Sequence, residues 1–209
     1  MILKNIVALT PILLGCSLTH AASQVFSDDF NNYVPDQFNW SPPVSSGWSV
    51  TDGTVDLNGA GGNYDFLPGN GSYVDLDGSS FVSGLFSNHV NLVGGTTYLL
   101  SFDLAGSHRG TLADTVHVGF GSATASYMLD SMDAFSTYTL SFTPATNGTY
   151  SFSYLDVSGD NRGLFLDNVS VTAVPEPATS AMLLAGLGVL GCWVRLKNCK
   201  TRRIQPSGA

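Results

Sequence analysis

The stretch TYLLSFDL, residues 97–104, indicates the fold class because it carries a large apolar side chain at every second position. The residues on this apolar side are Tyr98, Leu100, Phe102 and Leu104. Successive side chains of a β-strand point to opposite faces of the sheet. The stretch therefore predicts a strand with one face in a core and the other in water.

The same period of two recurs through residues 25–173, and no part of this region has a helical period. It places on one face, in turn, the sets Val116, Val118 and Phe120; Tyr138, Leu140 and Phe142; and Tyr150, Phe152 and Tyr154. Turn-forming segments such as LPGNG and PATNG separate the strands. About ten short strands predict an all-β fold, an antiparallel jelly-roll-like β-sandwich.

One predicted strand, GLFLDNVSVT at residues 163–172, changes phase. Leu164 and Leu166 share one parity, whereas Val169 and Val171 share the other. The slip at residues 167–168 indicates a β-bulge or a strand with two buried faces. An alternative is that the slip aims the Asp167 side chain at a ligand.

The charges are unevenly distributed. Residues 23–174 contain fifteen aspartates but only two cations, Arg109 and Arg162, which gives this body a net charge of −13. Binding of nucleic acid through phosphates requires clustered Lys and Arg, so this composition excludes it. The body also lacks cysteine, which excludes disulfides and a thiol nucleophile. We expect Arg109, in the loop sequence SHRG, to pair with one of the aspartates.

The N-terminus, residues 1–22, has the features of a signal peptide. Lys4 precedes an apolar run over residues 6–18, and small residues follow, with cleavage expected after Ala21 or Ala22. Two alternatives are a lipoprotein site at Cys16 and an N-terminal helix of the core. The prediction therefore places residues 23–173 outside the cytoplasm.

The C-terminus has three parts in a fixed order. Pro175, Glu176 and Pro177 come first, and the uncharged residues 178–194 then predict a transmembrane helix. The basic residues that follow, expected to hold this end in the cytoplasm, are Arg195, Lys197, Lys200, Arg202 and Arg203. Residues 204–209 are expected to be disordered. A plain C-terminal membrane anchor is one interpretation of this order.

Residues 174–203 also resemble the PEP-CTERM sorting signal of Gram-negative bacteria, because the tripeptide, helix and basic tail coincide. The resemblance implies that an exosortase, a membrane enzyme, cuts near residues 175–177 and reads Glu176. The protein would be anchored in the inner membrane before cleavage. It would afterwards lie at the cell surface or in the extracellular matrix, among exopolysaccharide.

The body resembles the jelly-roll domains of carbohydrate-binding modules. The matching segments are SDDFNNY at 27–33, SGWSVTDG at 46–53 and LFLDNVSV at 164–171. The resemblance implies that the first and last strands are neighbours whose acidic residues share a structural Ca²⁺. The candidate ligands are Asp29 and Asp167, with Asp28 and Asn31 as further ones. Alternatively, Asp29 and Asp167 are turn and cap residues with solvated carboxylates.

We expect a non-enzymatic surface or matrix protein that binds glycan or other matrix material. Trp40 and Tyr64 are the candidate rings for stacking on sugars, whereas Trp48 is expected in the core. The alternatives are a secreted hydrolase of polysaccharide and a purely structural or adhesive module. Fifteen aspartates form many pairs by chance, so a pair alone does not indicate a glycosidase.

Overall fold

The computed structural model describes residues 22–110, 112–175, 186–191 and 193. Ala22–Pro175 forms one compact unit, and residues 186–191 and 193 of the second unit are helical. None of the helical segments in the described part of the chain has both the length and the apolar composition that a membrane crossing requires. The predicted signal peptide, most of the predicted helix at 178–194, the basic tail and residues 204–209 lie outside the described residues.

The compact unit consists of β-strands and one short 3₁₀ turn. Its elements are β1 (Gln24–Asp28), η1 (Val44–Ser46), β2 (Ser49–Thr51), β3 (Asp56–Gly59), β4 (Ser72–Asp75), β5 (Leu85–Leu92), β6 (Tyr98–Ala105), β7 (Asp114–Phe120), β8 (Ala123–Leu129), β9 (Ser136–Phe142), β10 (Gly148–Asp156) and β11 (Phe165–Ala173).

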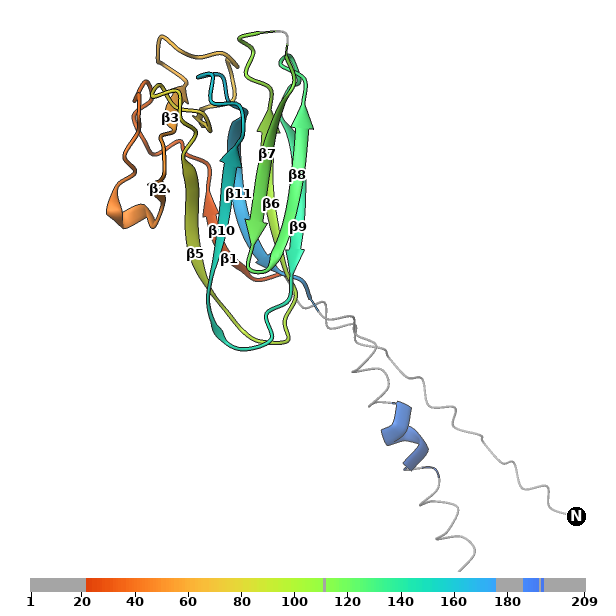
Figure 1. Cartoon of the computed structure of the whole chain (residues 1–209). Helices are drawn as coiled ribbons and strands as arrows, with labels where there is room; N and C mark the ends of the chain where they lie inside the picture. Colours follow the sequence, from red (N-terminus) through yellow and green to blue (C-terminus); the bar gives the residue numbers. More distant parts are fainter. Residues whose placement is uncertain (1–21, 111, 176–185, 192, 194–209) are drawn as a thin grey trace, which may run out of the picture. The chain divides into compact units, whose positions relative to one another are not determined.

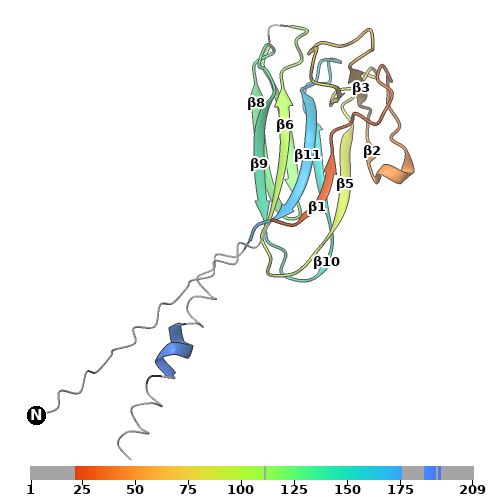
Figure 2. The ribbon, with the colours of Figure 1, turned by 180° about the vertical axis from the view of Figure 1, so that it is seen from behind.

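The strands form two sheets that pack face to face (Figure 1). One sheet has the order β3-β4-β11-β6-β9, and β1 also pairs with β11, beside which it lies in Figure 2. The other has the order β2-β5-β10-β7-β8, and neighbouring strands in both sheets are antiparallel. This arrangement confirms the predicted all-β sandwich of jelly-roll type, including neighbouring first and last strands.

The core lies between the sheets and contains the predicted apolar faces. Leu100, Phe102 and Leu104 of β6 are fully buried. Trp48 is buried as expected, and its ring stacks on Phe86 with centroids 4.1 Å apart. Burial of such large side chains is the main stabilising contribution in a domain without disulfides.

The predicted phase slip is a β-bulge. The pairing of β11 with β6 shifts register between Asp167 and Ser170. Asn168 takes a left-handed conformation, with φ of 50°. The extra residue lets β11 bury Leu166 before the bulge and Val169 after it.

The sandwich has two distinct ends. β1 begins and β11 ends at the terminal end. This end also carries the turns at residues 93–97, 121–122 and 143–147. At the loop end, β6 and β10 finish and β7, β9 and β11 begin. The nine residues of β11 run from one end to the other, about 30 Å at the usual rise of a strand.

Candidate functional site

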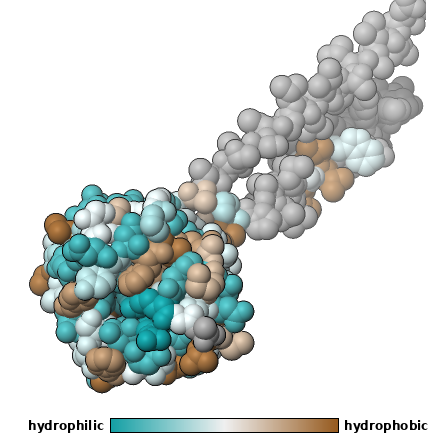
Figure 3. Space-filling view, turned by 90° about the horizontal axis from the view of Figure 1, so that it is seen from above, coloured by the Kyte–Doolittle hydropathy of each residue, from teal (hydrophilic) through white to brown (hydrophobic). Residues whose placement is uncertain are grey.

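A cavity of about 340 Å³ opens at the loop end, the end that Figure 3 views from above. Its lining comes from residues 38, 56, 58, 64, 66, 79, 109 and 161–162, several of which are far apart in the sequence. The fold brings them together because β3, β6 and the start of β11 all meet this end. We call it the loop-end cavity.

Aromatic rings form one wall of the loop-end cavity. Phe38 and Tyr64 are 49% and 43% exposed, and their rings meet edge to face with centroids 4.9 Å apart. Asp36 fixes the loop that carries Tyr64, because its carboxylate accepts hydrogen bonds from the backbone N–H of Asn63 (2.5 Å) and of Tyr64 (3.2 Å). The wall therefore presents rigid apolar rings to solvent.

A fixed guanidinium forms a second wall. Arg109 pairs with the buried carboxylate of Asp75, which confirms the predicted ion pair. It also donates to the backbone oxygen of Asn161 at 3.1 Å and lies 4.9 Å from the centroid of Phe66. Burial raises the pKa of Asp75, and the charge of Arg109 opposes that rise. Arg109 is thereby held in one orientation.

Two amide side chains in the cavity have buried oxygens without partners. Asn58 is 2% exposed, and its Oδ1 accepts no hydrogen bond; the Oδ1 of Asn161 is in the same state. The backbone of Asn161 is nevertheless fixed, since its N–H donates to Asp77 at 2.6 Å. A buried acceptor without a donor costs about 1–3 kcal/mol, and a ligand hydroxyl would remove that cost once a side-chain rotation turns the oxygen toward the cavity.

The remaining polar groups of the cavity divide into two kinds. Asp56 is satisfied within the fold, because it accepts from the backbone N–H of Asn39 and from both the N–H and the hydroxyl of Ser79. Arg162 is exposed and has no ion pair in the described part of the chain. Both arginines of the acidic body therefore line this one cavity.

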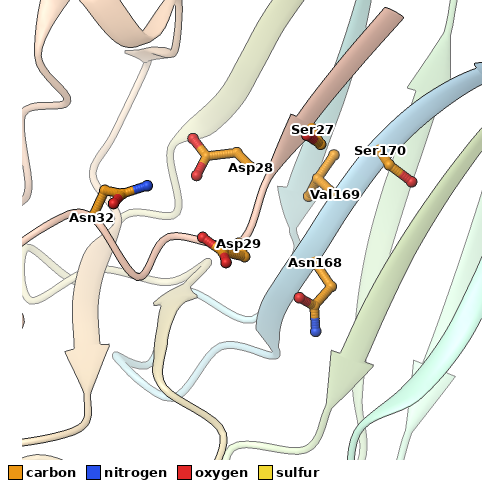
Figure 4. A pocket seen from close by; sticks show the side chains of 7 residues that line it. All are labelled: Ser27, Asp28, Asp29, Asn32, Asn168, Val169 and Ser170. Carbon is orange, nitrogen blue, oxygen red and sulfur yellow. The ribbon is translucent and has the colours of Figure 1, made fainter. Parts of the chain in front are cut away.

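A second, polar cavity of about 450 Å³ lies where β1 meets β11 (Figure 4). In Figure 4 Asp29 lies between the segment that carries Asn32 and the strand that carries Asn168. Asp28 pairs in register with Val169, so the bulge of β11 faces the end of β1. We call it the strand cavity.

Two of the four predicted calcium ligands are used by the fold itself. Asp28 accepts hydrogen bonds from the backbone N–H of Phe30 (2.9 Å), the hydroxyl of Tyr33 (2.8 Å) and Nε1 of Trp48 (2.9 Å). The side-chain oxygen of Asn31 accepts from the backbone N–H of Ser72 at 2.8 Å. Asp28 therefore links the end of β1 to Trp48, just before β2, and Asn31 links its loop to the start of β4.

Asp167, the principal candidate, is 2% exposed and does not line the strand cavity. Burial, and then the charges of Asp103, Asp29 and Asp28, raise its pKa to about 7, although a hydrogen bond from the N–H of Asn168 opposes the rise. A nearby divalent cation would stabilise the charged carboxylate and so offset the cost of burying its charge.

Asp29 is the other candidate, and it is exposed, with one hydrogen bond from the N–H of Asn31 at 3.2 Å. No group of three or more His, Cys, Asp or Glu in the described residues has the spacing of a metal site. The calcium site at Asp29 and Asp167 therefore stays a prediction. Further ligands for it would come from amide or backbone oxygens.

Of the two predicted sugar-stacking rings, only Tyr64 is exposed at a cavity. The expectation for Trp40 is wrong, because its ring is 4% exposed and packs against Tyr33 and Phe86 in the core. A ring enclosed on its faces cannot stack on a sugar.

A pair of desolvated carboxyl groups, relevant to hydrolysis, lies elsewhere. Burial, and then the charge of Asp156, raise the pKa of Asp114 to about 6. Asp156 accepts from the N–H and hydroxyl of Ser158 and from the N–H of Leu164. Neither aspartate lines a cavity described above, and Asp156 binds the chain segment that precedes β11.

Residues 173–197 match the PEP-CTERM protein-sorting motif. The match begins at the last residue of β11 and includes Pro175, Glu176 and Pro177. Comparison with curated protein sequences finds no match.

Solved structures with a similar fold include an arabinose-bound α-L-arabinofuranosidase, at a TM-score of 0.50 and 12% identity. The match covers 72% of this chain but only 26% of that one. Others are carbohydrate-binding modules, such as a xylan-binding domain from Paenibacillus barcinonensis, at a TM-score of 0.47 and 10% identity, over 75% of this chain and 98% of that one. Xylanase modules from Clostridium thermocellum match at a TM-score of 0.46 and 16% identity, over 75% of this chain and 30% of that one.

Proposed function

We propose that the protein is exported, is processed by an exosortase, and binds carbohydrate at the cell surface or in the exopolysaccharide matrix through its loop-end cavity. The sorting part is supported by the motif at residues 173–197. The binding part is supported chiefly by one observation, the unpartnered oxygens of Asn58 and Asn161 beside exposed aromatic rings.

The chemistry of the loop-end cavity suits a sugar. Exposed rings pack against the apolar C–H face of a pyranose, and the unpartnered amide oxygens accept hydrogen bonds from its hydroxyls. Arg109 and Arg162 supply donors for oxygen atoms of the ligand. A few fixed polar groups beside apolar walls are the usual composition of a small-ligand site.

The binding part is tested by titrating the purified protein with exopolysaccharide of the producing cell. We expect Tyr64→Ala to weaken binding about tenfold, equivalent to ~1.4 kcal/mol. The matched control is Phe81→Ala, because Phe81 is an exposed ring that does not line the cavity. Equal affinity of the two variants would reject this site.

The sorting part is tested by mass spectrometry of the protein from the cell surface. We expect a C-terminus near residues 175–178, and an uncut, membrane-bound form when Glu176→Ala is introduced. Surface protein that retains Arg202 and Arg203 would show instead a plain anchor.

Two alternatives have less support. A polysaccharide hydrolase needs two carboxyl groups at the bound sugar, whereas Asp56 is the one carboxylate that lines the loop-end cavity, and Asn39 and Ser79 already hydrogen-bond to it. In a purely structural module, no ligand would compensate the free-energy cost of the unpartnered oxygens in the loop-end cavity.

A further inference from the structure

The terminal end of the sandwich carries no charge. Its described residues contain no Asp, Glu, Lys, Arg or His over the ranges 22–25, 90–100, 119–125, 140–150 and 171–175. Hydrogen bonds join these segments, for example from the N–H of Gly95 to the oxygen of Pro144 and from the N–H of Val174 to that of Thr97, both at 2.8 Å. All fifteen aspartates of residues 23–174 lie outside these ranges, in the rest of the strands or in other loops.

Within the compact unit, the strands set the distance from this end to the nearest aspartates. Asp28 lies four residues along β1 from Gln24, which is about 13 Å at the rise of a strand. Asp103 and Asp167 lie further from the ends of β6 and β11. Charges interact weakly beyond the screening length of about 8 Å at physiological salt. Glu176, which directly follows Pro175, is the acidic residue nearest to this end in the sequence. With that one carboxylate, the terminal end meets less repulsion from an anionic surface than the aspartate-rich loop end does.

The terminal end is also the part nearest to the sorting signal. Val174 is still hydrogen-bonded to the fold, and the uncharged segment at 178–194 starts three residues after Pro175. Three peptide units reach at most about 10 Å. The segments at this end carry three exposed valines, namely Val25, Val93 and Val174.

We infer that the terminal end is a membrane-facing surface that rests on phospholipid headgroups while the tail is uncut. This inference rests on the proposed anchoring of the unprocessed protein. It holds the loop-end cavity about 30 Å from the bilayer, directed outward. The acidic loop end is repelled by anionic lipid, so the same charge distribution orients the body.

The test uses the full chain, with Cys16, Cys192 and Cys199 replaced by Ser, in vesicles of phosphatidylethanolamine and phosphatidylglycerol. A fluorophore is attached at Ala145→Cys, an exposed turn position of the terminal end, or at Met132→Cys near the loop end, which is 67% exposed. Headgroup-labelled quencher lipid should quench the first probe at least threefold more than the second.

A substitution that adds a charge then tests whether the absence of charge at this turn lets the terminal end approach the lipid. Thr146→Asp, at the same turn, should reduce quenching of the Ala145→Cys probe, and its matched control Thr146→Asn should not. Equal quenching at both labelled positions in vesicle-bound protein would overturn this inference but would leave the proposed anchoring intact. Protein that fails to float with the vesicles would overturn the proposed anchoring, and this inference with it.

Discussion

The loop-end cavity and the strand cavity are both polar, but their acceptor atoms differ in state. In the strand cavity, Asp28 accepts hydrogen bonds from three donors of the fold, and the side-chain oxygen of nearby Asn31 accepts one from the N–H of Ser72. In the loop-end cavity, the oxygens of Asn58 and Asn161 have no donor. A satisfied acceptor stabilises the fold, whereas an unsatisfied one lowers stability and favours a ligand that supplies a donor. The predictions on Asp28 and Asn58 below test this contrast directly.

The largest effect is expected for Asp28→Ala. The variant leaves the N–H of Phe30, the hydroxyl of Tyr33 and Nε1 of Trp48 without their acceptor, and should lower the free energy of unfolding by about 3 kcal/mol. Urea denaturation with a chelator present measures this change. Asp29→Ala, at an exposed neighbour, should change it by less than ~0.5 kcal/mol. Similar losses would contradict the distinct role given to Asp28.

Calcium should have the next largest effect if Asp29 and Asp167 bind it. A ligand at a hundredfold excess over its dissociation constant adds about 2.7 kcal/mol to stability. Calcium should then raise the melting temperature, and Asp167→Asn should abolish this response. Without calcium, the same variant should melt higher than the wild type, because it removes a charge that is buried and that Asp103 and Asp29 repel. A melting temperature that changes with neither calcium nor chelator would rule the site out.

A smaller effect, on binding more than on stability, is expected for Asn58→Ala. Removing the unpartnered oxygen should leave the free energy of unfolding within ~1 kcal/mol of the wild type or raise it. Carbohydrate affinity should fall about tenfold, equivalent to ~1.4 kcal/mol. Titration calorimetry and denaturation on the same samples separate the two. A destabilised variant with full affinity would show that Asn58 only supports the fold.

The smallest effect is a pH dependence of stability. The pKa of Asp114, about 6, and that of Asp167, about 7, both exceed the usual value near 4. The folded state therefore binds these protons more tightly than the unfolded state, so stability falls as the pH rises from about 4 to about 8. The melting temperature without calcium should drop by a few degrees between pH 5 and pH 8. Asp114→Asn should flatten the curve, and a rise over this interval would contradict the assignment.

The strands could be predicted because their signal is local. The alternation at residues 97–104 reports burial directly, and the slip at Asp167–Asn168 reports a bulge. The position of Trp40 could not be predicted, because the residues around it resemble an exposed loop. Its burial depends on Phe30, Tyr33 and Phe86 from other segments.

The loop-end cavity was beyond local patterns for the same reason. Its lining comes from five separate parts of the chain, and no motif spans them. One signal was available in the sequence, since Arg109 and Arg162 are the only cations of an acidic body. Their scarcity indicated special positions, but only the topology shows that the two share a cavity.

The placement of β11 has a mechanical consequence. This strand links the loop end to Val174, and it is bonded along its length by β6 on one side and by β4 and β1 on the other. A pull on Val174, opposed by a polymer held at the loop end, acts along the strand axis. Its inter-strand hydrogen bonds lie perpendicular to that pull. They are loaded together in shear, so the sandwich resists tension in this direction better than a pull that opens the bonds one by one.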